Sequence, residues 1–156
     1  ENTFLFHAFI LKEFNNRWFL VGKKRPKAPI SNLALDRIIA IDYDFQTPYI
    51  EENFDAEKFY KNVVGVTVNT GLNPRKIELW IDAINAPYVI TKPLHNSQRL
   101  IQTNDDGSII IHLLLIENYE LERLLLGFGN GLEIIKPERL RNRFKMILEQ
   151  SIEKYN

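Results

Sequence analysis

The feature that most constrains the fold is a pair of asparagines, Asn15–Asn16, placed between two strand-like runs. Phe4–Leu11 is apolar except for His7, and the similar run Arg17–Val21 follows the pair. Small polar residues between two such runs are typical of a tight turn. The sequence therefore predicts an antiparallel β-hairpin near the start of the chain.

The hairpin is followed by a loop and then by more strand-like sequence. The segment "KKRPKAP" (23–29) carries two prolines, which forbid regular strand pairing. Strand character returns in "ISNLALDRIIAIDY" (30–43), with a bend expected near Asp36. Several short strands so close together predict a small β-barrel or sandwich.

A linker is predicted next, and it contains one short helix. Asp55 is a good N-cap for a helix that runs to about Val63, with Phe59 and Val63 on one face. The turn-rich stretch "GVTVNTGLNP" (65–74) then leads into the second half. We therefore place a domain boundary between residues 45 and 70.

The second half predicts an alternation of strands and helices. "NDDGS" (104–108) is a strong hairpin turn, and Pro137 suits the first position of a closing helix. The expected elements are the strand 75–82, the short helix 83–89, the strands 99–103 and 108–116, the helix 119–126, the strand 132–135 and the helix after Pro137. The order β-α-β-β-α-β-α is a split βαβ arrangement and fits a ferredoxin-like layer.

Composition narrows the class of protein and the kinds of site. The 156 residues carry 20 Lys and Arg against 20 Asp and Glu, so no overall basic charge indicates nucleic acid. The absence of Cys excludes disulfides and thiolate zinc sites. Three scattered histidines and the spacing of the carboxylates predict no metal site. No run has the length of a membrane span, and we expect no membrane association.

Several residues could carry chemistry, and each has a structural alternative. His95 and Ser97 in "PLHNSQR" resemble a catalytic pair, but tying down their own loop is favoured. "GFGNG" (127–131) follows a predicted helix, so it is interpreted as a C-cap and turn. The loop "KKRPK" could bind phosphate or be a solvated run of charge. Arg37 lies between apolar neighbours in "ALDRII", which calls for a carboxylate such as Asp36 or for a ligand.

The order of these motifs resembles a known family. "RWFLVG" (17–22) followed by "LALDRI" (33–38) resembles the WYL domain of bacterial transcriptional regulators, and "AFILKEFNNRW" (8–18) looks like its usual opening. "GVTVNTG", "IELWIDAINAPYV", "PLHNSQ" and "LLLGFGNGLEIIKPERLR" are similar, in the same order, to the C-terminal extension (WCX) that often follows. The resemblance covers nearly the whole chain.

The resemblance implies an α+β fold with two parts. Residues 1–50 would form a small Sm-like or SH3-like β-barrel, residues 51–70 a linker with a short helix, and residues 71–156 the ferredoxin-like α/β extension. It also implies a non-enzymatic, cytoplasmic sensor that binds a nucleotide or single-stranded nucleic acid and dimerises through the extension. The DNA-reading helix-turn-helix would lie upstream of Glu1.

The family's groove residues carry over only in part. Trp18 and Leu20 match the tag, Phe19 stands where Tyr is usual, and Arg37 matches the groove arginine. Ser31 stands where a second arginine is common. The expected ligand site therefore consists of Phe19, Arg37 and Ser31, with His7 and the basic loop as possible additions, and no catalytic residue or cofactor is expected.

Three functions remain open at this level. The favoured one is the ligand-sensing half of a bacterial regulator, in which Arg37 grips an anionic ligand. The second is a structural dimerisation module with a degenerate groove, suggested by the departures at Phe19 and Ser31. The third is a hydrolase that uses Ser97 and His95.

Overall fold

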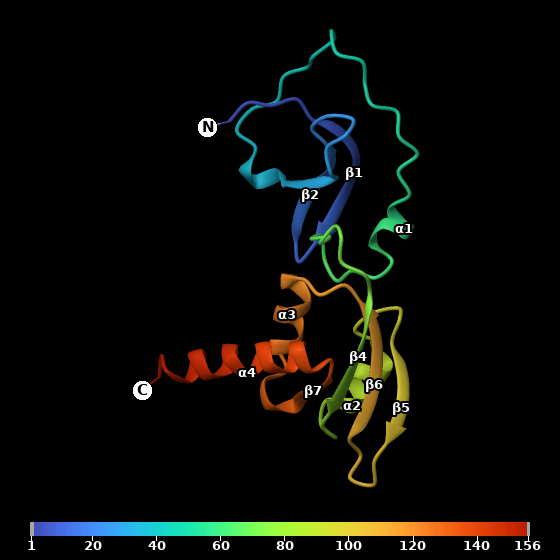
Figure 1. Cartoon of the computed structure of the whole chain (residues 1–156), viewed down its shortest axis with the longest axis vertical. Helices are drawn as coiled ribbons and strands as arrows, with labels where there is room; N and C mark the ends of the chain where they lie inside the picture. Colours follow the sequence, from blue (N-terminus) through green and yellow to red (C-terminus); the bar gives the residue numbers. More distant parts are fainter. Residues whose placement is uncertain (1, 156) are drawn as a thin grey trace.

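The computed structural model describes residues 2–155 and contains two antiparallel sheets (Figure 1). The first sheet has the order β1-β2-β3, with β1 (His7–Phe14), β2 (Arg17–Lys23) and β3 (Ser31–Ala34). It occupies one end of the molecule, and the second sheet occupies the other (Figure 1). The chain is thus a mixed α/β protein with antiparallel sheets, as predicted. The outer limits of the predicted domains, residues 1 and 156, lie outside the described range.

The predicted hairpin is present and turns at the two asparagines. Asn15 and Asn16 have φ angles of 51° and 60°, which lie in the left-handed region that Asn tolerates better than most residues. Two successive residues of this kind match the right-handed twist of paired strands. The Glu13 carboxylate also accepts a hydrogen bond from the backbone N–H of Asn16 at 2.6 Å.

A close backbone approach marks the other end of this hairpin. The register of β1 against β2 shifts between Ala8 and Ile10, which leaves Gly22 opposite Ala8. A Cβ atom added to Gly22 would lie 2.0 Å from the carbonyl oxygen of His7. Only glycine fits at this position of β2.

The first sheet is not closed into a barrel within residues 2–155, so the predicted Sm-like or SH3-like barrel is not confirmed. After β3 a 3-10 turn, η1 (Leu35–Arg37), bends the chain at the expected place. From residue 38 to Asp55 no strand follows, although the apolar alternation predicted one. The apolar side chains at positions 39, 41, 43 and 45 are 71–91% exposed. Alternation makes a strand only where a neighbouring strand supplies pairing, and among the described residues none pairs with 39–45.

The linker helix is present and shorter than predicted. α1 (Ala56–Tyr60) begins at its N-cap Asp55, whose side chain accepts from the Lys58 N–H at 3.0 Å. The helix ends at Tyr60, three residues before the expected Val63. The chain then enters a buried stretch that includes Val63, Val64 and Val66.

The second half has the predicted order of elements. They are β4 (Arg75–Ile81), α2 (Ala86–Thr91), β5 (Arg99–Thr103), β6 (Ile109–Leu115), α3 (Tyr119–Leu126), the 3-10 turn η2 (Gly129–Gly131), β7 (Leu132–Lys136) and α4 (Glu138–Ile152). The strands lie in the order β5-β6-β4-β7, and each neighbouring pair is antiparallel. β4 and β6 are therefore the central strands.

The hydrophobic core lies almost entirely on one face of this second sheet. Alternate residues of β4 and β6, from Ile77 to Leu115, are completely buried against the helices. Leu121 and Leu125 of α3 and Leu140 of α4 pack on them. α4 then extends away from the body of the molecule (Figure 1). Among residues 2–155, no helix combines the length and the apolar character that crossing a bilayer needs.

Candidate ligand-binding surface on the first sheet

The first sheet has two different faces, which follow from the alternation of β2. Val21 is completely buried and lies opposite Asn32, whose side-chain amide donates to the carbonyl of Val66 at 3.3 Å. We call this side, which faces segment 54–66, the inner face. Leu20 lies on the opposite, outer face, paired with Leu11 and Leu33.

An ion pair at the hairpin end of the sheet decides the environment of Arg37. The Arg17 guanidinium lies 3.1 Å from the carboxylate of Asp36, and both side chains are half-exposed. This pair fixes η1 beside the start of β2. Arg37 is exposed, and no described carboxylate lies within 4.0 Å of it. Asp36, the carboxylate suggested by the sequence as a partner for Arg37, thus pairs with Arg17 instead, and the Arg37 guanidinium faces solvent.

Trp18 is the aromatic residue that this end of the sheet offers to a ligand. It lies opposite Glu13 on the outer face and is 51% exposed. Phe19, the predicted ligand residue, is half-buried on the inner face between Lys12 and Ala34. The sequence motif contains the signal for this difference, because a strand that buries Val21 must turn Trp18 to the other side.

Ser31 lies at the far end of the sheet from Arg37. It is half-buried opposite Gly22, three residues along β2 from Phe19, or roughly 10 Å at the rise of a strand. The same alternation puts Ser31 and Phe19 on opposite faces. The four predicted residues therefore do not converge on one groove.

His7 is occupied by a structural contact. It is 5% exposed, and its Nδ1 atom accepts the backbone N–H of Ile50 at 3.1 Å. Beside it, the Tyr49 hydroxyl donates to the Ala8 carbonyl at 2.6 Å, and Lys23 pairs with Glu52. His7 thus helps to fasten residues 49–52 onto the first sheet.

The pair His95 and Ser97 is arranged as a loop fastening. The Ser97 hydroxyl lies 2.9 Å from His95 Nδ1 and also accepts the backbone N–H of Leu114 at 3.0 Å. His95 Nδ1 accepts the Ser97 backbone N–H at 3.1 Å. Burial lowers the pKa of His95 below its usual 6.5. These contacts hold the loop before β5 against β6.

A charged cluster that the sequence did not predict lies on the open face of the second sheet. His112 Nε2 lies 2.6 Å from a carboxylate oxygen of Glu78, and Lys136 Nζ lies 3.9 Å from the other oxygen. The hydrogen bond from His112 lowers the pKa of Glu78 more than any other contact. A cavity of about 400 Å³ borders Glu78 and is lined by Lys76, Lys136 and Glu138. The opposite charges satisfy one another here, and among residues 2–155 no cluster of three His, Asp or Glu side chains could hold a metal ion.

In a comparison with known families, residues 73–152 match the model described as the WCX domain. This range runs from just before β4 to the end of α4 and covers half of the chain. A search of the curated proteins finds no match.

Among solved structures, the chain is similar to the proteasome accessory factor B/C (PafBC) of Arthrobacter aurescens. The identity is 16% and the TM-score 0.47, over 97% of this chain and 22% of that chain. The chain thus spans about a fifth of the length of that protein, and a likeness at this level carries no argument about function.

Proposed function

This chain belongs to the WCX domain family, and on that premise we propose that it is the ligand-sensing part of a WYL-type bacterial transcriptional regulator. Residues 7–50 are the WYL part, supported by the tag "RWFLVG" on β2 and "LALDRI" across β3 and η1. Residues 73–152 are the WCX extension. The strand order β5-β6-β4-β7 supports a ferredoxin-like description of that extension.

The proposed ligand is a nucleotide or a short single strand of nucleic acid. The observation that carries this proposal is the exposed guanidinium of Arg37, which has no carboxylate partner among residues 2–155. A guanidinium presents parallel donors that match phosphate oxygens. Trp18 offers a half-exposed aromatic surface at the same end of the sheet, on which a base can stack. The contact between Arg17 and Asp36 holds η1 in place without neutralising Arg37.

The test is fluorescence polarisation of labelled short DNA and RNA single strands at low and physiological salt. We expect Arg37→Ala to weaken binding roughly tenfold or more, because a charged hydrogen bond contributes about 1.5–3 kcal/mol. Trp18→Ala should weaken binding by a similar factor, since stacking contributes about 1–3 kcal/mol per base.

The matched control is Arg139→Ala, which removes another exposed arginine, in this case from α4 of the second half. Binding that falls with salt in the wild type and survives in the control would support the site. Equal losses in Arg37→Ala and Arg139→Ala would mean diffuse attraction, and unchanged binding in Arg37→Ala would reject the assignment.

A second function, a dimerisation module, is favoured by the apolar outer face of the first sheet. Leu11 is 56% exposed there and lies beside Leu20 and Leu33. Solvent-facing apolar rows of this kind mark association surfaces. A concentration-dependent dimer in sedimentation, abolished by Leu11→Glu, together with no oligonucleotide binding, would favour this function over sensing.

We further propose that the chain acts without catalysis in the cytoplasm, downstream of a helix-turn-helix that reads DNA. The Ser97 hydroxyl accepts the backbone N–H of Leu114, which supports a structural role for that serine. Hydrolase activity that disappears in Ser97→Ala would contradict the non-enzymatic assignment.

A further inference from the structure

Segment 54–69 touches both sheets, and its bonds to the second sheet are numerous and directional. The Asn62 side chain donates to the Leu114 carbonyl at 2.7 Å, and the Asn62 carbonyl accepts the Ile116 N–H at 2.8 Å. The buried Asn118 amide donates to the carbonyls of Val64 and Thr67, each at 2.8 Å. These bonds cross from the linker to β6 and to the residue that caps α3.

Thr67 and Gly65 add a second attachment to α3. The Thr67 hydroxyl donates to the Glu120 carboxylate at 2.6 Å, and the Thr67 N–H donates to the same oxygen at 3.2 Å. Gly65 lies under this side chain, since a Cβ there would be 2.6 Å from Glu120 Cγ. Asn69 donates to the Glu117 carbonyl at 2.7 Å. Residues 62–69 are therefore held as part of the second unit.

The contacts of the same segment with the first sheet are of another kind. Phe9 stacks on Phe54 with ring centroids 5.4 Å apart, and Phe54 meets Phe59 edge-on at 5.2 Å. Lys12 Nζ lies 4.5 Å from the centre of the Tyr60 ring. The long Asn32–Val66 hydrogen bond, at 3.3 Å, is the one direct polar bond described between this segment and β1, β2 or β3. We call Phe9, Lys12, Phe54, Phe59 and Tyr60 the aromatic joint.

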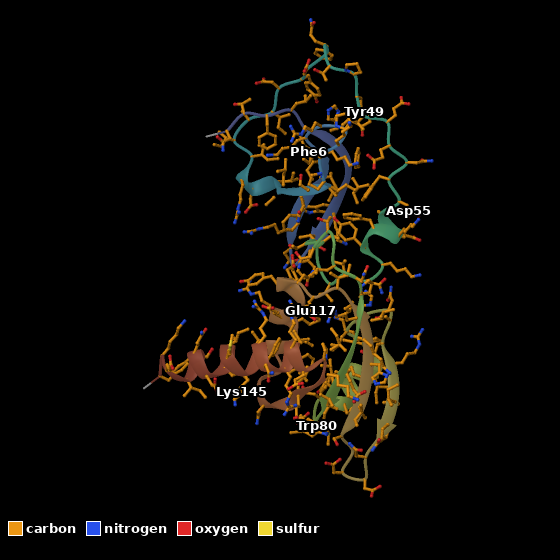
Figure 2. All side chains as sticks on the ribbon, in the orientation of Figure 1. Phe6, Tyr49, Asp55, Trp80, Glu117 and Lys145 are labelled. Atoms are coloured by element: carbon orange, nitrogen blue, oxygen red, sulfur yellow. The ribbon has the colours of Figure 1, made fainter. Side chains whose placement is uncertain are left out.

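The chain crosses between the two units at residues 53–55. Tyr49 and Ile50 are bonded to β1, and Glu52 pairs with Lys23, so these residues move with the first sheet. Asp55 caps α1, and α1 leads directly into residues 62–69. Figure 2 shows Asp55 between Tyr49, beside the first sheet, and Glu117, at the second unit.

We propose that the first sheet turns as a rigid body on the aromatic joint while residues 56–69 stay fixed to the second sheet. Apolar and cation–π contacts are weakly directional and survive a change of angle, whereas the short hydrogen bonds of the linker do not. Lys12 pairs with Phe19 on the inner face, so the joint is continuous with the strand that carries Trp18. A ligand on that strand would act by favouring one angle of the joint. The regulatory role of the joint rests on the proposed function, but the rotation of the first sheet does not.

The absence of Cys makes the test direct, because two introduced cysteines can be spin-labelled without background. Lys27→Cys with Asp105→Cys spans the joint, and Lys58→Cys with Asp105→Cys lies within the second unit; all three positions are exposed. Double electron–electron resonance on the full chain should give a broad distance distribution for the first pair and a narrow one for the second.

The variant Phe54→Leu removes the ring at the centre of the joint and should broaden or shift only the first distribution. Phe45→Leu is the matched control, because Phe45 is 91% exposed and outside the joint, and it should change neither. A narrow first distribution unchanged by Phe54→Leu would overturn the proposal. Equal broadening of both pairs would also overturn it, because the linker would then move with the first sheet.

The spin-label test of the joint can be interpreted independently of the test of ligand binding. The distances are measured without ligand, so a rigid joint would leave the sensing proposal intact. A mobile joint in a chain that binds no oligonucleotide would refute the sensing proposal and leave the proposed motion intact. Addition of the single-stranded DNA probe to the labelled wild type should narrow the first distribution. Bound DNA that leaves this distribution unchanged would overturn the regulatory role of the joint.

Discussion

At the scale of single residues, the half-buried ring of His95 makes stability depend on pH. Its pKa is lowered by burial, and its Nδ1 atom already accepts the Ser97 N–H. The unfolded chain therefore binds a proton near the usual value of 6.5, and the folded chain does so only at lower pH. The contribution of His95 to the free energy of unfolding is full above pH 6.5 and decreases as the pH falls below it.

Urea unfolding at pH 7.5 and pH 5.5 tests this expectation. The wild type should lose stability between the two values, and His95→Asn, which keeps an acceptor at that place but cannot titrate, should lose less. His112→Asn is the comparison variant, because the His112 ring pairs with Glu78 on the open face of the second sheet. An identical loss in the wild type and His95→Asn would show that His95 does not contribute.

The residue scale is also where sequence interpretation of the site was weakest. Arg37 was predicted from the order of the motifs and from its apolar neighbours, but the sequence could not show that Asp36 would pair with Arg17 of β2 instead. The motif places Ser31 and Phe19 in one predicted site, but the alternation of side chains along the strands puts the two residues on opposite faces of the sheet. His7 was expected at a ligand site, and its contact with Ile50 forms only because a distant segment returns to β1.

At the scale of elements, Asn118 joins a helix cap to a linker contact. Its Oδ1 accepts the Leu121 N–H at 2.8 Å, and its amide donates to the carbonyls of Val64 and Thr67. We expect Asn118→Ala to lower the free energy of unfolding by about 2–4 kcal/mol, because the cap is lost and two carbonyls, one buried and one partly buried, lose their donor. Chemical denaturation measures this loss.

The variant Asn118→Asp separates the two roles. It keeps the acceptor for Leu121 and replaces the donor amide by a carboxylate that faces two carbonyls. It should therefore destabilise the protein, although Asp is a good N-cap. Near-neutral stability would mean that the linker contacts contribute little, and the solvent-exposed cap Asp55→Ala, at about 1 kcal/mol, sets the scale.

Element order in the second half could be predicted from the sequence because each element carries its own local signal. The turn at Asp105–Gly107 and the proline before α4 fix two boundaries. Local signals of this kind could not show whether the first half closes into a barrel. A barrel closes only when extended segments find partners, and the segment after Arg37 alternates correctly but stays unpaired.

At the scale of the whole molecule, stability is concentrated in one half. The buried core runs from Val64 to Phe144, while the first sheet contributes Val21 as its one fully buried apolar side chain among the described residues. We expect native-state hydrogen exchange to be slowest in β4 and β6 and fastest in β1–β3, because local opening follows the loss of buried contacts. Equal protection of Leu20 and Ile111 would contradict this expectation.

The sequence predicts two parts, and the structure contains two separate sheets, but the way the linker attaches to them could not be predicted. The turn-rich stretch at 65–74 was predicted to lead from the domain boundary into the second half, and in the structure Val66 is buried and the Thr67 carbonyl accepts from Asn118. No local pattern shows which partner a linker will choose, because that choice depends on side chains such as Asn118 that lie some fifty residues away.

The hairpin tip at Asp105–Gly107 has a practical consequence. It is closed by its own bond between Asn104 and Ser108, and it lies at the end of the molecule opposite the first sheet (Figure 1). Exposed loop tips of this kind tolerate insertions. A fluorescent protein inserted there would label the chain at a point away from the first sheet and would leave the proposed ligand surface uncovered.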